Sequence, residues 1–269
     1  PSNNQNQVSF FTTEDTSGVY ASGVDNAIIF ENSKYMEIPL GGTDFGNEVT
    51  VAFWAYGNPG IQPANSYSFE AVNTSNQRVL NVHLPWSNGN VYWDAGEGSG
   101  YDRINKAASE SEYEGNWVHW AFTKNAVTGS MKIYKNGALW HSGTGLTLAV
   151  GEIDRFVVGK GFASSDSHNG KMDEFQVWNV ELDEATIAGW MNKRINNSHP
   201  NYADLLAYYD FDQADYQLTD QSANTNTPVL IGAPQIVAKS NEAYMLDATL
   251  TSDRPLLTFV QGDFTTHLD

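Results

Sequence analysis

Two strand-like segments, RVLNVHL (78–84) and NVYWDA (90–95), carry rings and polar groups at alternating positions. Because side chains on a strand alternate between its two faces, one face should reach the core with Leu80, Val82, Leu84, Val91 and Trp93. The opposite face should then carry Asn81, His83, Tyr92 and Asp94. The C–H face of a sugar stacks on aromatic rings, and its hydroxyls bond to planar polar groups. This pattern therefore predicts a carbohydrate-binding face.

Residues from nearby loops could extend this face. The loop GSGYDRIN (98–105) could bring Tyr101 and Arg103 to the same edge, and Trp86 lies at the tip of the turn between the two segments. Similar side chains also occur on ordinary solvated sheet faces, so a plain surface without a ligand is the alternative interpretation.

Composition narrows the class of partner. The chain has 269 residues, 14 Lys and Arg against 32 Asp and Glu, and a formal net charge of −18 at pH 7. Such a charge repels phosphate backbones and anionic headgroups, so we expect no nucleic-acid partner. No apolar run is long enough for a membrane helix, so we expect no membrane insertion. Without cysteine, neither a disulfide framework nor a cysteine-based zinc site can form.

Short runs rich in Val, Ile, Phe, Tyr and Trp recur between Gly, Asn, Asp and Ser clusters along the chain. Many strands joined by turns, with few helical stretches, favour an all-β fold of two packed antiparallel sheets. Asn136-Gly137 predicts a two-residue type I′ hairpin. Further turns are expected at 87–90 and at 125–129.

One segment, LDEATIAGWMNKRI (182–195), departs from the β pattern. Its apolar residues recur at helical spacing, acidic residues lie in its first turn and basic residues in its last. We expect one short amphipathic helix whose apolar side packs on the sandwich.

The segment WVHWAFTK (117–124) has apolar side chains on both of its faces. Val118, Trp120 and Phe122 share one face, while Trp117 and His119 lie on the other. Because both faces should be covered, His119 is interpreted as a half-buried histidine with satisfied hydrogen bonds rather than a ligand.

Residues 20–190 resemble the laminin G-like, concanavalin A-type jelly roll found in large secreted bacterial proteins. The resemblance depends on five blocks: NAIIFENSKYMEIP, VTVAFWAY, WVHWAFTK, MKIYKNGALW and GKMDEFQVWNVELDEATI. The last block is the most specific, because it matches the family's closing strand and helix at Gly170, Asp173, Glu174, Trp178, Leu182 and Ile187. The resemblance implies a curved two-sheet sandwich and a role in carbohydrate or protein binding.

The same scaffold also carries hydrolases and lyases, so catalysis must be judged from the residues. Hydrolases of this fold present E-x-D-x-x-E on one strand, but here the final acid is replaced by Val157 in 152–157 and by Thr186 in 181–186. The segment YKNG (134–137) matches the lyase pattern Y-x-K-x-G-x-Y only superficially. No H-E-x-x-H, G-x-S-x-G or phosphate-binding glycine loop occurs. We expect a protein that is not an enzyme.

The resemblance also implies a structural Ca²⁺ site. It would use Asp173 of the closing strand, with Asp25 or Glu31 of the first strand contributing, because Ca²⁺ takes carboxylate and carbonyl oxygens. Glu31-Asn32 stands where Asp-Gly is commoner, and a purely structural role for these carboxylates is the alternative.

These observations predict a laminin G-like domain at 1–212 and a C-terminal extension at 213–269 that adds edge strands or begins a linker. The chain begins at Pro1 without Met, which we interpret as a mature or excised piece of a longer protein that is secreted or displayed at the cell surface. Its expected function is carbohydrate binding that targets its parent protein to a polysaccharide or glycan, alongside that protein's other domains. The alternatives are a protein-adhesion or structural module, and a polysaccharide lyase or glycoside hydrolase with an unrecognised site.

Overall fold

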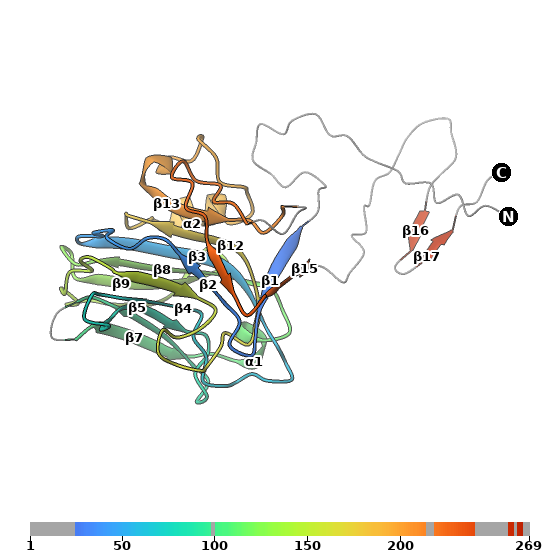
Figure 1. The fold of residues 1–269 in the computed structure, drawn as a ribbon, viewed down its shortest axis with the longest axis horizontal. Coiled ribbons are helices and arrows are strands. Elements are labelled where there is room, and N and C mark those ends of the chain that lie inside the picture. Colours follow the sequence, from blue (N-terminus) through green and yellow to red (C-terminus); the bar gives the residue numbers. More distant parts are fainter. Residues whose placement is uncertain (1–24, 98–99, 214–217, 240–257, 261–262, 266–269) are drawn as a thin grey trace.

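The computed structural model describes residues 25–97, 100–213, 218–239, 258–260 and 263–265. Within them, two antiparallel sheets lie face to face as a sandwich (Figure 1). The prediction of an all-β, two-sheet antiparallel sandwich is therefore confirmed.

The first sheet has eight strands, and β13 (Leu205–Tyr209) pairs with β12 beside the main path. In order across the sheet, that path consists of β10 (Ala138–Gly143), β9 (Ser130–Lys135), β8 (Val118–Asn125), β3 (Glu48–Gly57), β12 (Gly170–Trp178), β1 (Asn26–Phe30) and β15 (Gln235–Ala238).

The second sheet has seven strands. In order, they are β14 (Val229–Ile231), β2 (Tyr35–Ile38), β11 (Arg155–Val158), β4 (Phe69–Val72), β5 (Arg78–His83), β6 (Asn90–Ala95) and β7 (Asp102–Ala107). A separate hairpin is formed by β16 (Thr258–Val260) and β17 (Asp263–Thr265).

Aromatic rings from both sheets meet in the core between the layers. Phe53 of β3 stacks on Phe122 of β8 with ring centroids 5.9 Å apart, and its ring meets the edge of Phe69 of β4 at 6.2 Å. Phe69 in turn stacks on Phe156 of β11 at 5.6 Å. Burial of each such ring contributes roughly 1.5–3 kcal/mol, so the contact between Phe53 and Phe69 stabilises the packing of one sheet on the other.

The strand alternation inferred from sequence is correct in β5, β6 and β8. The predicted inward side chains all belong to the core, namely Leu80, Val82, Leu84, Val91, Trp93, Val118, Trp120 and Phe122. Apart from Val79, which shares the core with Leu80, their neighbours within these strands face away from the core, and this positions the candidate site.

The predicted β9–β10 hairpin also forms as expected. Asn136 and Gly137 have φ of 49° and 79°, the positive values that a type I′ turn requires. A Cβ atom on Gly137 would lie 2.9 Å from the Cα of Ala188, so glycine is also needed for close packing of this turn against the following helix.

That helix, α2 (Glu184–Trp190), is shorter than the predicted span of 182–195. Asp183 begins it, because its carboxylate accepts a hydrogen bond of 2.7 Å from the backbone N–H of Thr186. Ile187 packs on the sheet, whereas Ile195 reaches the same apolar cluster from the segment after the helix.

Two short helical elements were not expected from the sequence, namely α1 (Glu110–Tyr113) and the 3₁₀ turn Tyr202–Asp204. Within the described residues, no helix is long and apolar enough to cross a membrane.

The outer faces of the two sheets differ in their cover. The outer face of the eight-stranded sheet lies beneath α2 and the segment that leads to β13 (Figure 1), where an apolar cluster includes Ala52, Ala121, Trp178 and Ile187. The outer face of β4–β7 has no helix over it within the described chain. Any binding surface on a sheet face is therefore expected there.

The C-terminal part of the chain returns to both sheets. β14 pairs with β2 in the seven-stranded sheet, and β15 pairs with β1 in the eight-stranded sheet. Residues 229–238, which lie beyond the predicted boundary at 212, thus form edge strands of the sandwich.

Candidate functional site

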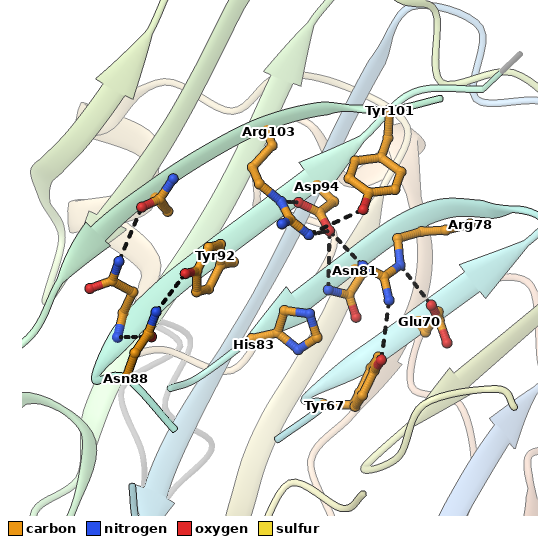
Figure 2. A network of polar contacts seen from close by, with 12 residues as sticks. Tyr67, Glu70, Arg78, Asn81, His83, Asn88, Tyr92, Asp94, Tyr101 and Arg103 are labelled. Atoms are coloured by element: carbon orange, nitrogen blue, oxygen red, sulfur yellow. Dashed lines mark hydrogen bonds and ion pairs between the residues drawn. The ribbon is translucent and has the colours of Figure 1, made fainter. Parts of the chain in front are cut away.

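Four neighbouring strands place a row of polar side chains across the uncovered face. Glu70 of β4 is paired with Asn81 of β5, Asn81 with Asp94 of β6, and Asp94 with Arg103 of β7. Cross-strand partners lie close enough for their side chains to interact, so this register alone brings four distant residues together (Figure 2).

Asp94 is the centre of an ionic network on this face. Its side chain has no exposed surface, and its two oxygens accept hydrogen bonds from Arg103 at 2.6 and 2.7 Å and from Arg78 at 2.8 Å. Arg78 also donates to Glu70 at 2.7 Å, and the other Glu70 oxygen accepts from the backbone N–H of Phe162 at 2.7 Å. Two arginines balance two carboxylates, so the network is neutral overall.

The carboxylates keep both guanidinium groups charged. Burial lowers the pKa of Arg78, but the nearby Glu70 and Asp94 outweigh burial and raise that pKa above its ordinary value. The hydrogen bond to Asp94 raises the pKa of Arg103. Both arginines therefore stay protonated hydrogen-bond donors at any physiological pH.

A hollow of about 300 Å³, which we call the aromatic hollow, opens above this network. It is lined by Tyr67, Arg78, His83, Trp86, Tyr92 and Arg103. The His83 ring packs against three others, with centroid distances of 4.4 Å to Trp86, 4.5 Å to Tyr67 and 5.8 Å to Tyr92. Ligand pockets in proteins span ~300–1,000 Å³, so this hollow is at the small end of that range.

His83 is held in one tautomer. Burial lowers its pKa to about 4, so the ring is neutral at pH 7. Its Nδ1 lies 2.6 Å from the carbonyl oxygen of Ser66, which can only accept, so we assign the proton to Nδ1. Nε2 is then a hydrogen-bond acceptor for a ligand hydroxyl.

The rim of the hollow combines tyrosine rings with the two guanidinium groups. Arg103 lies over the rings of Tyr92 and Tyr101 at 4.9 and 5.1 Å, and Arg78 lies 5.3 Å from the Tyr101 ring. The Arg103 and Tyr101 side chains remain accessible, with exposures of 37% each. Arg103 thus lies over both Tyr92 and Tyr101, although Tyr101 keeps 37% of its surface exposed, and the half-buried ring of Trp86 lines the hollow beside them.

The seven residues predicted to bind a ligand divide into two groups. His83, Trp86, Tyr92 and Arg103 line the hollow, and Tyr101 stands at its rim. Asn81 and Asp94 are fully buried beneath them, so they do not meet a ligand directly as the sequence suggested. Instead, Asp94 accepts hydrogen bonds from Arg78 and Arg103, and it thereby positions two side chains that line the hollow.

Sequence reasoning missed Tyr67, Glu70 and Arg78. Strict alternation puts Arg78 on the core side with Leu80, but a register shift between β4 and β5 leaves both Val79 and Leu80 in the core and turns Arg78 outward. An arginine that alternation places in an apolar core is itself a signal of such a bulge. Tyr67 lies in the loop before β4, where alternation gives no guidance.

His119, interpreted as a satisfied half-buried residue, is almost fully buried beneath the cover of the eight-stranded sheet. Its ring meets Trp54 at 5.4 Å, and within the described residues its Nδ1 has no hydrogen-bond partner. Burial lowers its pKa to about 3, so the ring stays neutral. It is a packing residue away from the hollow.

The three carboxylates predicted to hold Ca²⁺ do not form one site. Asp25 and Glu31 lie at opposite ends of β1, roughly 20 Å apart along an extended strand. Glu31 accepts a hydrogen bond from Asn58 at 2.8 Å. Lys239 places its ammonium 2.7 Å from Asp173 and 3.7 Å from Asp25, where a cation bound by these two would lie.

Across the described part of the chain, no group of three or more His, Asp or Glu side chains suits a metal. Burial raises the pKa of both Asp173 and its neighbour Glu174, which favours a proton on one of them rather than two negative charges beside a metal. The residues present therefore do not fit the expected calcium site, and that expectation stays a prediction without a defined set of ligands.

Comparison with known families gives one match. A laminin G-like family, described as the concanavalin A-like lectin/glucanases superfamily, matches residues 30–188, which is more than half of the chain. No curated protein matches the sequence.

Two solved structures share the fold at low sequence identity. A candidate carbohydrate-binding protein from Bacteroides ovatus is 19% identical, with a TM-score of 0.55 over 80% of this chain and 60% of its own. A heptameric SAP-like pentraxin from Limulus polyphemus is 16% identical, with a TM-score of 0.52 over 80% of this chain and 95% of its own. The chain thus spans 60% of the length of the Bacteroides protein.

Proposed function

The chain belongs to the concanavalin A-like lectin/glucanases superfamily, and we propose that it is a non-catalytic module that binds carbohydrate through the aromatic hollow. The observation that carries this proposal is the uncovered hollow on β4–β7, where rings and fixed polar groups converge. Trp86 and Tyr101 supply surfaces for the C–H face of a sugar. Arg103 and His83 supply a donor and an acceptor for its hydroxyls.

The state of the carboxylates supports binding rather than catalysis. A glycosidase needs one carboxyl group free to transfer a proton and a second to attack or activate water. Both oxygens of Asp94 and both oxygens of Glu70 already accept hydrogen bonds. His83 donates to a backbone carbonyl and has its pKa lowered to about 4, which makes it a poor base near neutral pH.

We place this module in a larger secreted or cell-surface protein, where it would hold attached domains near a polysaccharide by raising their local concentration. The net charge of −18 suits an extracellular domain that must stay soluble and avoid nucleic acid.

A protein ligand is the second candidate. Tyr, Trp and Arg are the residues that contribute most to protein–protein interfaces, and all three meet in the aromatic hollow. Six residues line the hollow, whereas a standard protein–protein interface uses roughly 20–30 residues on each side, which favours a sugar.

A glycan array followed by titration calorimetry tests the proposal. We expect binding to at least one glycan and its loss in Trp86→Ala and Tyr92→Ala. Tyr35→Ala is a matched control, because Tyr35 is half-buried in β2 of the same sheet and does not line the hollow. Absence of glycan binding, or equal binding by all three variants, would contradict the proposal. Product release from a polysaccharide panel would point to an enzyme instead.

A further inference from the structure

A second, larger hollow of about 480 Å³ lies beside the aromatic hollow. Four separate segments supply its walls, with Asn32 from the β1–β2 turn, Asn65 from the loop before β4, Ser87 from the β5–β6 turn, and Asp166 and Asn169 from the loop before β12. We call it the asparagine hollow. Its lining is polar, whereas the aromatic hollow is lined mainly by rings.

The three asparagines that line this hollow have side chains available to a ligand. Within the described chain, the amides of Asn32, Asn65 and Asn169 form no hydrogen bond, whereas those of Asn58 and Asn88 are both engaged. The positive φ of Asn32 and Asn169 explains why a residue that tolerates this conformation stands there. Asn65 has no such conformational reason, and an amide is suited to pair with sugar hydroxyls.

The walls of the asparagine hollow are fixed by the protein itself. The backbone N–H of Asn169 donates to Phe30 at 2.8 Å, and the Asn169 carbonyl accepts from Asn58 at 3.0 Å. Ser33 donates its backbone N–H to Ser167 Oγ at 2.8 Å, which ties the β1–β2 turn to the loop before β12. A site whose walls are held in this way loses little entropy on binding.

The two hollows share a rim. Asn65 and Tyr67 flank Ser66, whose carbonyl accepts from His83 at 2.6 Å, and Trp86 is followed directly by Ser87. Asn65 and Ser87 line one hollow while Tyr67 and Trp86 line the other, and the rings of Tyr67 and Trp86 lie 6.0 Å apart. A ligand that crosses this pair of rings would enter both hollows.

The charges of both hollows argue against an acidic sugar. In the aromatic hollow, Arg78 and Arg103 are balanced by Asp94 and Glu70. The lining of the asparagine hollow includes Asp166 and no cation. A uronic acid or sulfated sugar would find no unbalanced positive charge here, and the net charge of −18 would oppose its approach.

We infer that the two hollows form one extended groove for an uncharged oligosaccharide, with one sugar ring against Trp86 and the following units hydrogen-bonded to Asn65 and Asn169. This inference rests on the proposed function, and it adds the class of ligand and a subsite.

The test measures affinity by titration calorimetry for neutral gluco-, manno- and xylo-oligosaccharides of increasing length. In a series that binds, we expect affinity to rise about tenfold from the monosaccharide to the trisaccharide, which corresponds to about 1.4 kcal/mol for the two added hydrogen bonds. The double variant Asn65→Ala/Asn169→Gly should lose this gain and keep the affinity for the monosaccharide. Glycine preserves the positive φ of Asn169, so the loop should keep its shape.

Matched controls separate the subsite from general effects. Asn76→Gly removes an amide at the same kind of positive-φ position, and Asn197→Ala removes an exposed amide, and neither residue lines a hollow. Equal affinity for short and long sugars, or an unchanged double variant, would overturn the inference and leave the proposed function standing. Preference for uronic or sulfated sugars would overturn the uncharged class. Absence of binding to every sugar would overturn both.

Discussion

The two outer faces of the sandwich contain the same kinds of residue and differ in what covers them. On the open face of β4–β7, His83 packs against Trp86 at 4.4 Å. On the covered face of the eight-stranded sheet, His199 packs against Trp178, also at 4.4 Å. Residue types alone therefore do not distinguish the open face from the covered face in this fold. The two faces are distinguished by α2 and the segment after it, which cover the face of the eight-stranded sheet.

The same contrast holds for two buried aspartates. Asp94 and Asp173 both have no exposed surface, and both contact a cation. Arg103, the partner of Asp94, reaches into an open hollow, whereas Lys239, the partner of Asp173, follows the edge strand β15. The first ion pair positions a guanidinium group in the open hollow, and the second fastens the C-terminal segment to the sandwich.

We expect the largest loss of folding stability from the substitution Asp94→Asn. The substitution leaves two arginines without their shared counter-charge, and loss of one partner of a buried pair costs about 3–5 kcal/mol. Urea unfolding at pH 7 measures this loss. Glu37→Gln is the control, because the Arg155–Glu37 pair is partly exposed and should contribute less than about 1 kcal/mol. Similar losses in both variants would show that the Asp94 network is no stronger than a surface pair.

Lys239→Met should destabilise the protein by about 3 kcal/mol, because it removes the ammonium that neutralises buried Asp173. Because the ammonium of Lys239 lies between Asp25 and Asp173 and Glu31 lies at the other end of β1, we expect added calcium to leave the unfolding midpoints of the parent chain and the variant unchanged. If calcium restored the unfolding midpoint of the variant, this account would be contradicted, because Asp173 would then be able to hold a divalent cation.

Ile187→Ala should separate stability from binding. Ile187 is buried between α2 and the sheet, and an Ile→Ala substitution in a core costs about 2–3 kcal/mol at such a site. Carbohydrate affinity should stay within twofold of the parent value, because the change lies on the covered face. A parallel loss of affinity in folded protein would mean that the two faces are coupled.

Lowering the pH tests how much the buried histidines contribute to folding stability. Burial lowers the pKa of His83, His168 and His199 to about 4, whereas an unfolded histidine has a pKa near 6.5. The unfolded chain therefore binds more protons between these values, and stability is fully present above about pH 6.5 and falls as pH drops toward 4. Each ring should contribute on the order of 1–2 kcal/mol to that loss.

Burial raises the pKa of Asp173 and Glu174, so these two groups add stability as the pH falls and oppose the histidines. Urea unfolding of the parent chain and of His199→Phe at pH 7 and pH 5 isolates the histidine contribution. The parent chain should lose more stability than the variant between the two pH values, and equal changes in both would refute the expectation. Binding should persist at pH 5, because His83 remains neutral there and keeps Nε2 as an acceptor.

Local patterns predicted the parts of this molecule that local physics controls. Regular alternation through β5 and β6 identified His83 and Tyr92 as outward residues, and Asn136-Gly137 identified a hairpin. In each case the signal lies within a few neighbouring residues. The fold class followed from the same signals repeated along the chain.

Long-range contacts and strand irregularities could not be predicted from these local patterns. The bulge in β5 reverses the side on which Arg78 lies, and only the pairing with β4 reveals it. Lys239 lies 66 residues from Asp173 in the sequence, so nothing in the sequence near Asp173 identifies its partner. The same holds for the burial of Asp94, which depends on arginines from two other strands.

The most direct test of the account is an NMR titration of the full chain with a neutral oligosaccharide that binds. The open-face account predicts that the indole signal of Trp86 and the imidazole signals of His83 shift on binding, while those of Trp54 and His119 beneath the covered face remain in place. Shifts confined to the covered face, with Trp86 and His83 unchanged at saturation, would contradict it.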